Sequence, residues 1–355
     1  MSRLRDLPAT RFRPADDGTA PEPPELRGSS RDGVRLLVAR PSGIDHLRFR
    51  ELGDVLRSGD LLVINNSATV PGEVDASRAD GGPVVLHLAN QLADGHRVVE
   101  LRSSPNAAEP VLDGVPGEVI ELSAGGTVTL LEPYPVAGSS PTGVGDRLWR
   151  GAVRTPEPLP AYLGRHARPI SYGYLRRSYP PASYQTVFAL RPGSAEMPSA
   201  GRPFTTDLVT RLVAAGIQFA PITLHTTVSS TEAGEAPLPE WFAVPEATAR
   251  MINLTQARHG RVIAVGTSAT RAIESAAGAD GTVRPRMGWT DLVISPERGV
   301  RVTSGLITGW HDPNASHLLL VEAVAGAERT QQAYDAAVAH GYLWHEFGDS
   351  SLLLP

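Results

Sequence analysis

The 355-residue chain contains neither cysteine nor lysine. The missing thiol excludes disulfides, thiolate zinc sites and cysteine redox chemistry, and it is typical of proteins in a reducing compartment. The missing ammonium group excludes a Schiff-base enzyme and an ordinary P-loop, because each requires a lysine. All 33 basic residues are arginine.

Long apolar runs are also missing. No stretch approaches the ~20 apolar residues needed to span a bilayer, and the first residues, 1–6, do not lead into an apolar targeting segment. The net charge of −5 argues against a protein that coats nucleic acid uniformly, so a polyanion would have to meet a local basic surface. We expect a soluble, cytoplasmic monomer that does not associate with membranes.

The pattern of apolar residues changes twice along the chain. Short buried strands are predicted at 34–38 and 60–64, before Asn65-Asn66, and residues 69–154 contain only short β-rich pieces separated by Gly, Pro and Asp. After residue 155 helical signals return, including a Thr205 cap. The sequence therefore predicts an α/β fold, a mixed sheet with helices, interrupted by an inserted small β-barrel. The expected domains are 1–68 with 155–355, and 69–154. Helices are expected at 207–215, 246–260, from 267 onwards, 316–325 and 333–339.

Two histidines follow predicted strands or turns, where a rigid scaffold can direct a side chain at a ligand. His225 ends the strand that contains Pro221, and His311 lies between Trp310 and Asp312. Either can transfer protons, and either can be a structural histidine at a strand edge or in a turn. Their spacing does not match a zinc-binding pattern, so we expect no metal site.

The buried strand 261–265 runs through Gly266-Thr267 into a helix. This strand-turn-helix junction can hold a carboxylate or a phosphate, although it lacks the full glycine pattern of a dinucleotide site. Arg271 and Glu274 lie on one face of the helix, where they can pair with each other or position a substrate.

Residues 147–202 contain nine arginines but only two acidic residues. Six tryptophan and tyrosine residues lie among these arginines, a composition that suits either an RNA-binding surface or a solvated loop. Arg176 and Arg177 are the candidate RNA contacts.

Taken in order, several runs resemble the S-adenosylmethionine:tRNA ribosyltransferase-isomerase family of queuosine biosynthesis. The resemblance extends from about Leu47 to the C-terminus. The matching runs are Gly59 to Asn66, Leu159 to Tyr162, Tyr184 to Phe188, Ala200-Gly201 with Phe204-Thr205, Thr223 to His225, Ile263 to Thr267 with Arg271 and Glu274-Ser275, Leu306 to Thr308 with His311 and Pro313, and Gly348-Asp349.

The resemblance implies an α/β domain interrupted by a β-barrel. It also implies transfer and isomerisation of the ribosyl part of S-adenosylmethionine onto a 7-aminomethyl-7-deazaguanine in tRNA, with release of adenine and methionine and with no further cofactor. On these matches we assign catalytic roles to His225, His311 and Glu274, with proton transfer by His225 or His311. Substrate recognition is assigned to Asn65, Asn66, Tyr184, Gln185, Thr186, Gly201, Thr205, Gly266, Thr267, Arg271 and Asp349.

The sequence departs from the family pattern inside several motifs. Ala68 stands where the family has an arginine, Pro203 replaces a histidine, and Thr226 to Ser230 replaces a glycine-rich run. These departures leave two alternatives open. One is a divergent paralogue that uses S-adenosylmethionine as a ribosyl or alkyl donor to a small nucleoside-like acceptor, and the other is a noncatalytic RNA- or nucleotide-binding protein.

Overall fold

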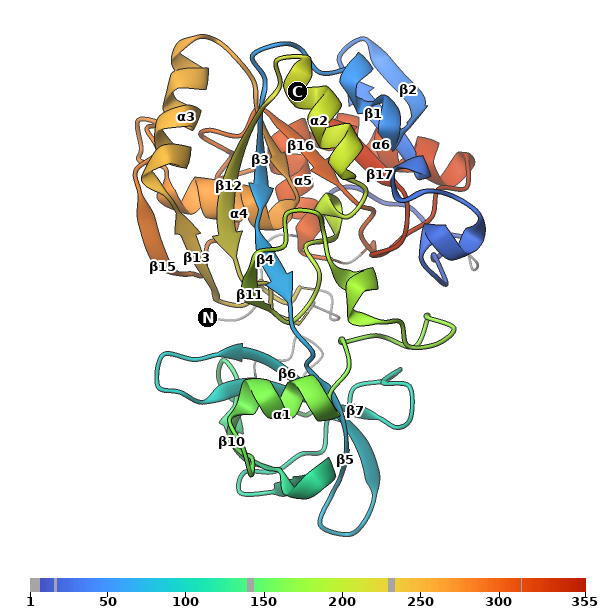
Figure 1. Cartoon of the computed structure of the whole chain (residues 1–355), viewed down its shortest axis with the longest axis vertical. Coiled ribbons are helices and arrows are strands. Elements are labelled where there is room, and N and C mark those ends of the chain that lie inside the picture. Colours follow the sequence, from blue (N-terminus) through green and yellow to red (C-terminus); the bar gives the residue numbers. More distant parts are fainter. Residues whose placement is uncertain (1–6, 16–17, 139–143, 229–233, 314) are drawn as a thin grey trace.

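The computed structural model describes residues 7–15, 18–138, 144–228, 234–313 and 315–355. These residues form a nine-stranded mixed sheet with helices and a separate closed barrel, which lies below the sheet in the view of Figure 1. The predicted fold class is therefore confirmed. The N-terminal residues 1–6 and Ser229-Ser230 of the run after His225 lie outside the described residues.

Four central strands of the sheet run parallel to one another. In spatial order they are β12 (Gln218–Leu224), β3 (Leu61–Asn65), β14 (Val262–Val265) and β16 (Gly305–Thr308). The last three are almost continuously apolar and buried, as parallel strands covered on both faces should be. Their carboxyl ends meet at one edge of the sheet, the edge at which open α/β sheets bind ligands.

The remaining strands extend the sheet on both sides. On one side β17 (Ser350–Leu353), β1 (Arg35–Arg40) and β2 (Gly43–Arg48) follow β16. On the other side β13 (Glu240–Val244) pairs antiparallel with β12, and β15 (Arg286–Thr290) pairs antiparallel with β13 and forms the edge.

Helices cover the two faces of the sheet, with α2 in front and α4 behind in Figure 1. Val63, Ile222 and Leu306 belong to the core on the face of α3 to α6, whereas Leu62 and Ile263 belong to the core on the face of α2. Thr205 caps α2 as predicted, because its hydroxyl accepts a hydrogen bond from Leu208 N. The helices are α2 (Thr206–Ala214), α3 (Glu246–Ala257), α4 (Thr267–Ala276), α5 (His317–Ala325) and α6 (Ala327–Ala339).

The helix expected at 333–339 begins earlier than predicted, directly after Gly326. Its first two turns, 327–332, are mostly polar, so the apolar pattern marks only its second half. Two short 3₁₀ turns lie in the described part of residues 18–33: η1 (Pro24–Arg27) and η2 (Arg31–Gly33). Further 3₁₀ turns are η3 (Phe49–Asp54), η4 (Ser123–Gly125), η5 (Pro181–Tyr184) and η6 (Ser199–Gly201).

The barrel has six strands in the order β10-β7-β6-β5-β8-β9. Its interior contains Val74, Leu86, Leu101 and Trp149, and the helix α1 (Leu159–His166) adds Tyr162. The nine-stranded sheet takes all its strands from outside residues 69–154. The predicted domain boundaries at 69 and 154 themselves stay a prediction. The barrel strands are β5 (Glu73–Ser77), β6 (Pro83–Gln91), β7 (Arg97–Ser103), β8 (Val119–Leu122), β9 (Thr127–Pro133) and β10 (Leu148–Arg154).

A small parallel pair, β4 (Ser67–Thr69) with β11 (Arg191–Ser194), lies where the chain leaves the sheet for the barrel. β4 follows β3 after a single residue, Asn66, so the pair extends from the carboxyl edge of the sheet. Within the described part of the chain, no helix is both long and apolar enough to cross a bilayer.

Candidate functional site

His225 lies at the carboxyl end of β12. Its Nδ1 is 2.8 Å from the hydroxyl oxygen of Ser67, which is 2.6 Å from that of Ser194. The imidazole also stacks on Trp241, with 5.2 Å between ring centroids. Gly193 leaves room for the ring, because a Cβ at that position would lie 2.6 Å from imidazole atoms. Three segments therefore fix one histidine at the edge of the sheet.

The charge state of His225 suits proton transfer. Burial lowers the pKa of His225, and the positive charge of Arg191 lowers it further. The neutral imidazole therefore predominates near pH 7 and can accept a proton. Nδ1 is occupied by Ser67, so Nε2 is the nitrogen left to meet a substrate.

Asn65 and Asn66 hold the neighbouring strand ends together. The amide of Asn65 donates to Leu224 O at 2.8 Å, and its oxygen accepts from Leu224 N and Ser67 N. Asn66 accepts from the hydroxyl of Thr223 at 2.7 Å. The structure therefore brings both predicted asparagines beside His225, with side chains that bind other parts of the protein.

Gly266 and Thr267 lie at the same edge, at the junction of β14 and α4. Gly266 has a φ of +95°, a backbone conformation that favours glycine, and Thr267 is the first residue of α4. The hydroxyl of the next residue, Ser268, accepts a hydrogen bond from the Asn65 amide at 3.2 Å. This junction therefore lies next to the Asn65 amide, as the prediction of a shared site requires.

His311 follows β16 at this edge. Its Nε2 is 3.0 Å from the Thr308 hydroxyl, and its ring stacks on His317 at 4.8 Å. Burial, followed by the charges of His317 and His345, places the pKa of His311 well below its usual value. Burial likewise lowers the pKa of His317 to about 4. Both imidazoles are therefore neutral at pH 7.

The segment 184–186 lies beside β4. The amide of Gln185 exchanges two hydrogen bonds with the backbone of Thr69, and the Tyr184 carbonyl accepts from the Thr69 hydroxyl. Thr186 accepts from Phe188 N, and its methyl group would lie 3.3 Å from a Cβ at Gly201. These residues fix the chain next to Ser67.

Three predicted site residues have their polar groups occupied by the protein itself. Arg271 binds Glu240 and the carbonyls of residues 238, 290 and 292. Glu274 accepts from the backbone of residues 301–303, just before β16, so it lies at the opposite edge of the sheet. Asp349 accepts from Arg35 and Leu343 N. This geometry does not support the predicted ligand contacts of Arg271 and Asp349 or the predicted catalytic role of Glu274.

The arginine-rich segment is not a single basic surface. Six of its nine arginines form ion pairs. Five of them pair with acidic residues from other segments, and Arg165 pairs with Glu157 of the same segment. Four of its aromatic residues are buried: Trp149, Tyr162, Tyr179 and Tyr184. The interpretation of the aromatic residues as an exposed stacking surface is therefore wrong for these four. The paired arginines are Arg147, Arg150, Arg165, Arg168, Arg176 and Arg202.

The two predicted RNA contacts are both exposed. Arg176 lies 3.7 Å from Glu22, and Arg177 lies over the Tyr179 ring at 5.5 Å. Their contact with RNA stays a prediction.

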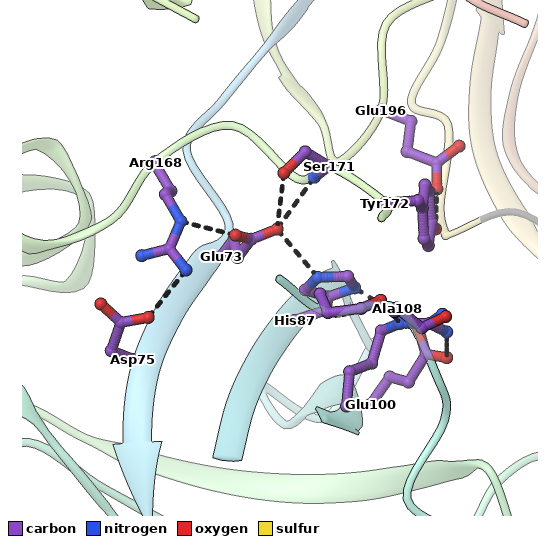
Figure 2. A network of polar contacts seen from close by, with 11 residues as sticks. Glu73, Asp75, His87, Glu100, Ala108, Arg168, Ser171, Tyr172 and Glu196 are labelled. Atoms are coloured by element: carbon purple, nitrogen blue, oxygen red, sulfur yellow. Dashed lines mark hydrogen bonds and ion pairs between the residues drawn. The ribbon is translucent and has the colours of Figure 1, made fainter. Parts of the chain in front are cut away.

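The sequence did not point to a second polar cluster, at the junction of the barrel and the segment that follows α1 (Figure 2). His87 lies between two carboxylates, 3.1 Å from Glu73 and 3.5 Å from Glu100. Glu73 also binds Arg168 and Ser171 N. Lone charged residues in separate strands do not predict such a cluster from the sequence.

Burial opposes a positive charge on His87, but hydrogen bonds and charges from Glu100 and Glu73 outweigh it and raise the pKa of His87. Burial also opposes charge on Glu73, but the hydrogen bond and charge of His87, the hydrogen bond from Ser171 N and the charge of Arg168 together outweigh it and lower the pKa of Glu73. The cluster therefore holds an imidazolium between two carboxylates.

Neither of two cavities of the molecule is lined by His225 or His311. One of about 240 Å³ opens at the amino ends of β3 and β14, where Arg57, Asp60 and Arg258 line it. A cavity of only about 10 Å³ lies beside Pro203, Gly309 and Asp349. Among the described residues, no three histidine, aspartate or glutamate side chains are placed to hold a metal ion.

Comparison with known proteins gives a consistent result. The model of a family described as queuosine biosynthesis protein matches residues 11–353. The chain belongs to this family. It is 34% identical over 337 residues to the S-adenosylmethionine:tRNA ribosyltransferase-isomerase of Acidiphilium cryptum, with 91% of this chain and 93% of the relative covered. The relative of that name from Gloeobacter violaceus is 35% identical, covering 92% and 90%.

A solved structure supports the same assignment. The crystal structure of the S-adenosylmethionine tRNA ribosyltransferase of Thermotoga maritima is 26% identical, with a TM-score of 0.52. The match covers 97% of this chain and 99% of that one. The family resemblance inferred from short runs is therefore confirmed, and it applies to both the sheet and the barrel.

Some residues at the candidate site were outside the prediction. Ser194, Trp241 and His317 contact His225 or His311 directly or through Ser67. Trp241 had no signal in the sequence that linked it to His225. Ser194 and His317 had none, because their role depends on tertiary contacts alone.

Proposed function

We propose that this chain transfers and isomerises the ribosyl moiety of S-adenosylmethionine onto a 7-aminomethyl-7-deazaguanine in tRNA. The observation that carries the proposal is His225, a neutral imidazole that Ser67 holds at the carboxyl end of β12. The relatives of this chain are named for the ribosyltransferase-isomerase activity. S-adenosylmethionine is the co-substrate. We place the reaction in the cytoplasm, where tRNA is modified, and expect the protein to act as a monomer.

The chemistry requires proton transfer at carbon. The sulfonium acidifies the adjacent ribose methylene, and His225 Nε2 is the base that accepts its proton. Adenine leaves with the electron pair of the glycosidic bond and takes up a proton from the imidazolium that His225 has become, because His311 is neutral at pH 7. Methionine leaves with the electron pair of the carbon–sulfur bond, which neutralises the sulfonium. The amine of the acceptor forms the new bond to the ribosyl carbon and releases one N–H proton to solvent, which balances the charge lost from the sulfonium.

The other site residues orient the reactants. Gly266 and Thr267, at the start of α4, lie where the methionine carboxylate or the ribose would bind. Gln185, Thr186 and Gly201 shape the wall beside β4. Arg176 and Arg177 remain the proposed phosphate contacts, and their contribution should decrease as salt increases.

The test uses the purified full chain, S-adenosylmethionine and tRNA that carries the aminomethyl deazaguanine. The proposal expects adenine and methionine in equal amounts and a tRNA nucleoside whose mass increases by the transferred ribosyl group. If adenine and methionine appear only with a free nucleoside acceptor, the paralogue is the correct function. Ala68 and Pro203, in place of a family arginine and histidine, are the observations that favour that second candidate. Binding without turnover of either acceptor would identify the noncatalytic alternative.

A further inference from the structure

Three neighbouring strands place aromatic rings in one row beside the candidate site. His225, at the end of β12, stacks on Trp241 of β13. Trp241 is in turn directly opposite Trp289 of β15. Directly opposite residues of an antiparallel pair have side chains on the same face, about 4.5–5.5 Å apart at Cβ. The row of His225, Trp241 and Trp289 therefore runs from the carboxyl end of β12 to β15, the outermost strand on that side of the sheet (Figure 1).

The row becomes more exposed towards the edge. Trp241 is half-buried, Trp289 is 38% exposed and Met287, two residues before it on the same face, is 74% exposed. The other three tryptophans of the chain, Trp149, Trp310 and Trp344, are at most 3% exposed. The accessible indoles of this protein are thus confined to the row.

The strands that carry the row are held firmly from the other face. Arg271 pairs with Glu240, next to Trp241, and donates to Thr290 O, next to Trp289. Fixed aromatic rings lose little conformational freedom when a flat ligand stacks on them.

Three exposed arginines lie near the row. Arg191 follows the 184–188 segment beside His225, and Arg284 and Arg286 flank the start of β15. All three are exposed, and within the described residues none forms an ion pair within 4 Å. An anionic ligand with flat, apolar faces would match both properties of this surface.

We propose that the row of His225, Trp241 and Trp289 is a stacking platform for unpaired bases of the RNA acceptor. The proposal rests on the proposed function and specifies where the loop around the reacting base is held. Bases stack on Trp289 and Trp241 in sequence, while the arginines meet the phosphates between them. Stacking of this kind is tolerant of sequence, because every base has a π-face.

A second copy of the chain is the other candidate partner, because an edge strand can pair with a strand of another molecule. β15 carries features that oppose strand pairing: Pro285 precedes it, Arg286 begins it and Gly288 interrupts it. These features favour a nucleic-acid ligand at this edge.

The test compares Trp289→Ala and Trp289→Phe with the wild type in binding to tRNA and to a short unstructured oligoribonucleotide. We expect both RNAs to quench tryptophan emission of the wild type. Trp289→Ala should weaken binding about 5- to 150-fold, the range for loss of one stacked base, and Trp289→Phe should retain most of the affinity. Because stacking releases no counterions, the slope of affinity against salt should stay unchanged in Trp289→Ala.

Leu254→Ala is the matched control, since Leu254 is an exposed apolar residue on α3. It should bind RNA as the wild type does. Equal affinity of Trp289→Ala and the wild type for both RNAs would overturn the platform and leave the proposed function intact. Light scattering could instead find an oligomer in the wild type that dissociates in Trp289→Ala, with RNA affinity unchanged. That result would assign the row to a contact with a second copy of the chain and would also overturn the platform. Quenching of the tryptophan emission by RNA, without release of adenine from S-adenosylmethionine, would contradict only the proposed function.

Discussion

At the residue scale, the position of His225 depends on small neighbours. Ser67 orients the ring through Nδ1, and Gly193 provides the space that the ring occupies. A histidine that is half-buried and bonded through one nitrogen keeps the other available for chemistry. The same cannot be said of His311, whose Nε2 already meets Thr308 and whose ring is covered by His317.

The first prediction follows from this difference. His225→Ala should lower the rate of adenine release by about 10²–10⁴-fold, the usual loss when a general base is removed. The melting temperature should change little, because the ring is half-exposed. His311→Ala is the comparison, and we expect it to lose stability as well as activity. A normal rate in His225→Ala would remove this histidine from the mechanism.

The second prediction concerns pH. The pKa of His225 is lowered, by burial and then by Arg191, so the acid limb of the kcat/KM profile should lie below pH 6.5. Arg191→Ala removes a positive charge and should raise the pKa of His225, which moves the acid limb to higher pH. The profile for S-adenosylmethionine at saturating tRNA measures this shift. An unchanged limb would contradict the assignment of His225 as the base.

At the scale of elements, Arg271 joins α4 to the two edge strands. Its guanidinium donates to the Glu240 carboxylate of β13 and to Thr290 O at the end of β15. Burial raises the pKa of Glu240, and the charge of Arg271 opposes that rise. The pair therefore stabilises the edge of the sheet only while both partners are present.

The third prediction tests this pair. Arg271→Met should lower the free energy of unfolding by about 3–5 kcal/mol, because it leaves a buried carboxylate without its partner. Urea unfolding measures the loss. The double variant Arg271→Met/Glu240→Gln should recover part of it, since the unpaired charge is gone. A single variant as stable as the wild type would show that the ion pair is not needed.

Arg271 also illustrates how far the sequence can predict this molecule. The strand 261–265, Gly266 and the helix after it are local features, and all were predicted correctly. The position of His225 at a strand end was also visible. The partners of Arg271, Glu274 and Asp349 were not, because they come from segments between 6 and 314 residues away. The excess of arginine in residues 147–202 wrongly indicated one basic surface for the same reason. Acidic residues distant in the sequence, such as Glu100 and Glu25, pair with these arginines only in the folded protein.

At the scale of the whole molecule, the cluster in Figure 2 connects the barrel with the chain that returns to the sheet. Glu73 and His87 belong to barrel strands, whereas Arg168 and Ser171 belong to the segment after α1. Tyr172 continues this segment, and its hydroxyl donates to Glu196, two residues after Ser194 of the His225 site. The barrel is thus attached through charged groups to the chain that supports the candidate base.

The last prediction uses the pH dependence of this attachment. Because the pKa of His87 is raised, the stability from its positive charge is fully present below its unfolded value of about 6.5 and is lost as the pH rises through the folded value. The wild type should therefore lose stability relative to His87→Gln as the pH increases from 6 to 9. Urea unfolding at both pH values measures the difference, and Asp75→Asn, at an exposed carboxylate bound to Arg168, is the control. A constant difference between wild type and His87→Gln would mean that His87 is neutral in the folded protein, and that its two carboxylates are held by Arg168, Arg102 and Arg147 alone.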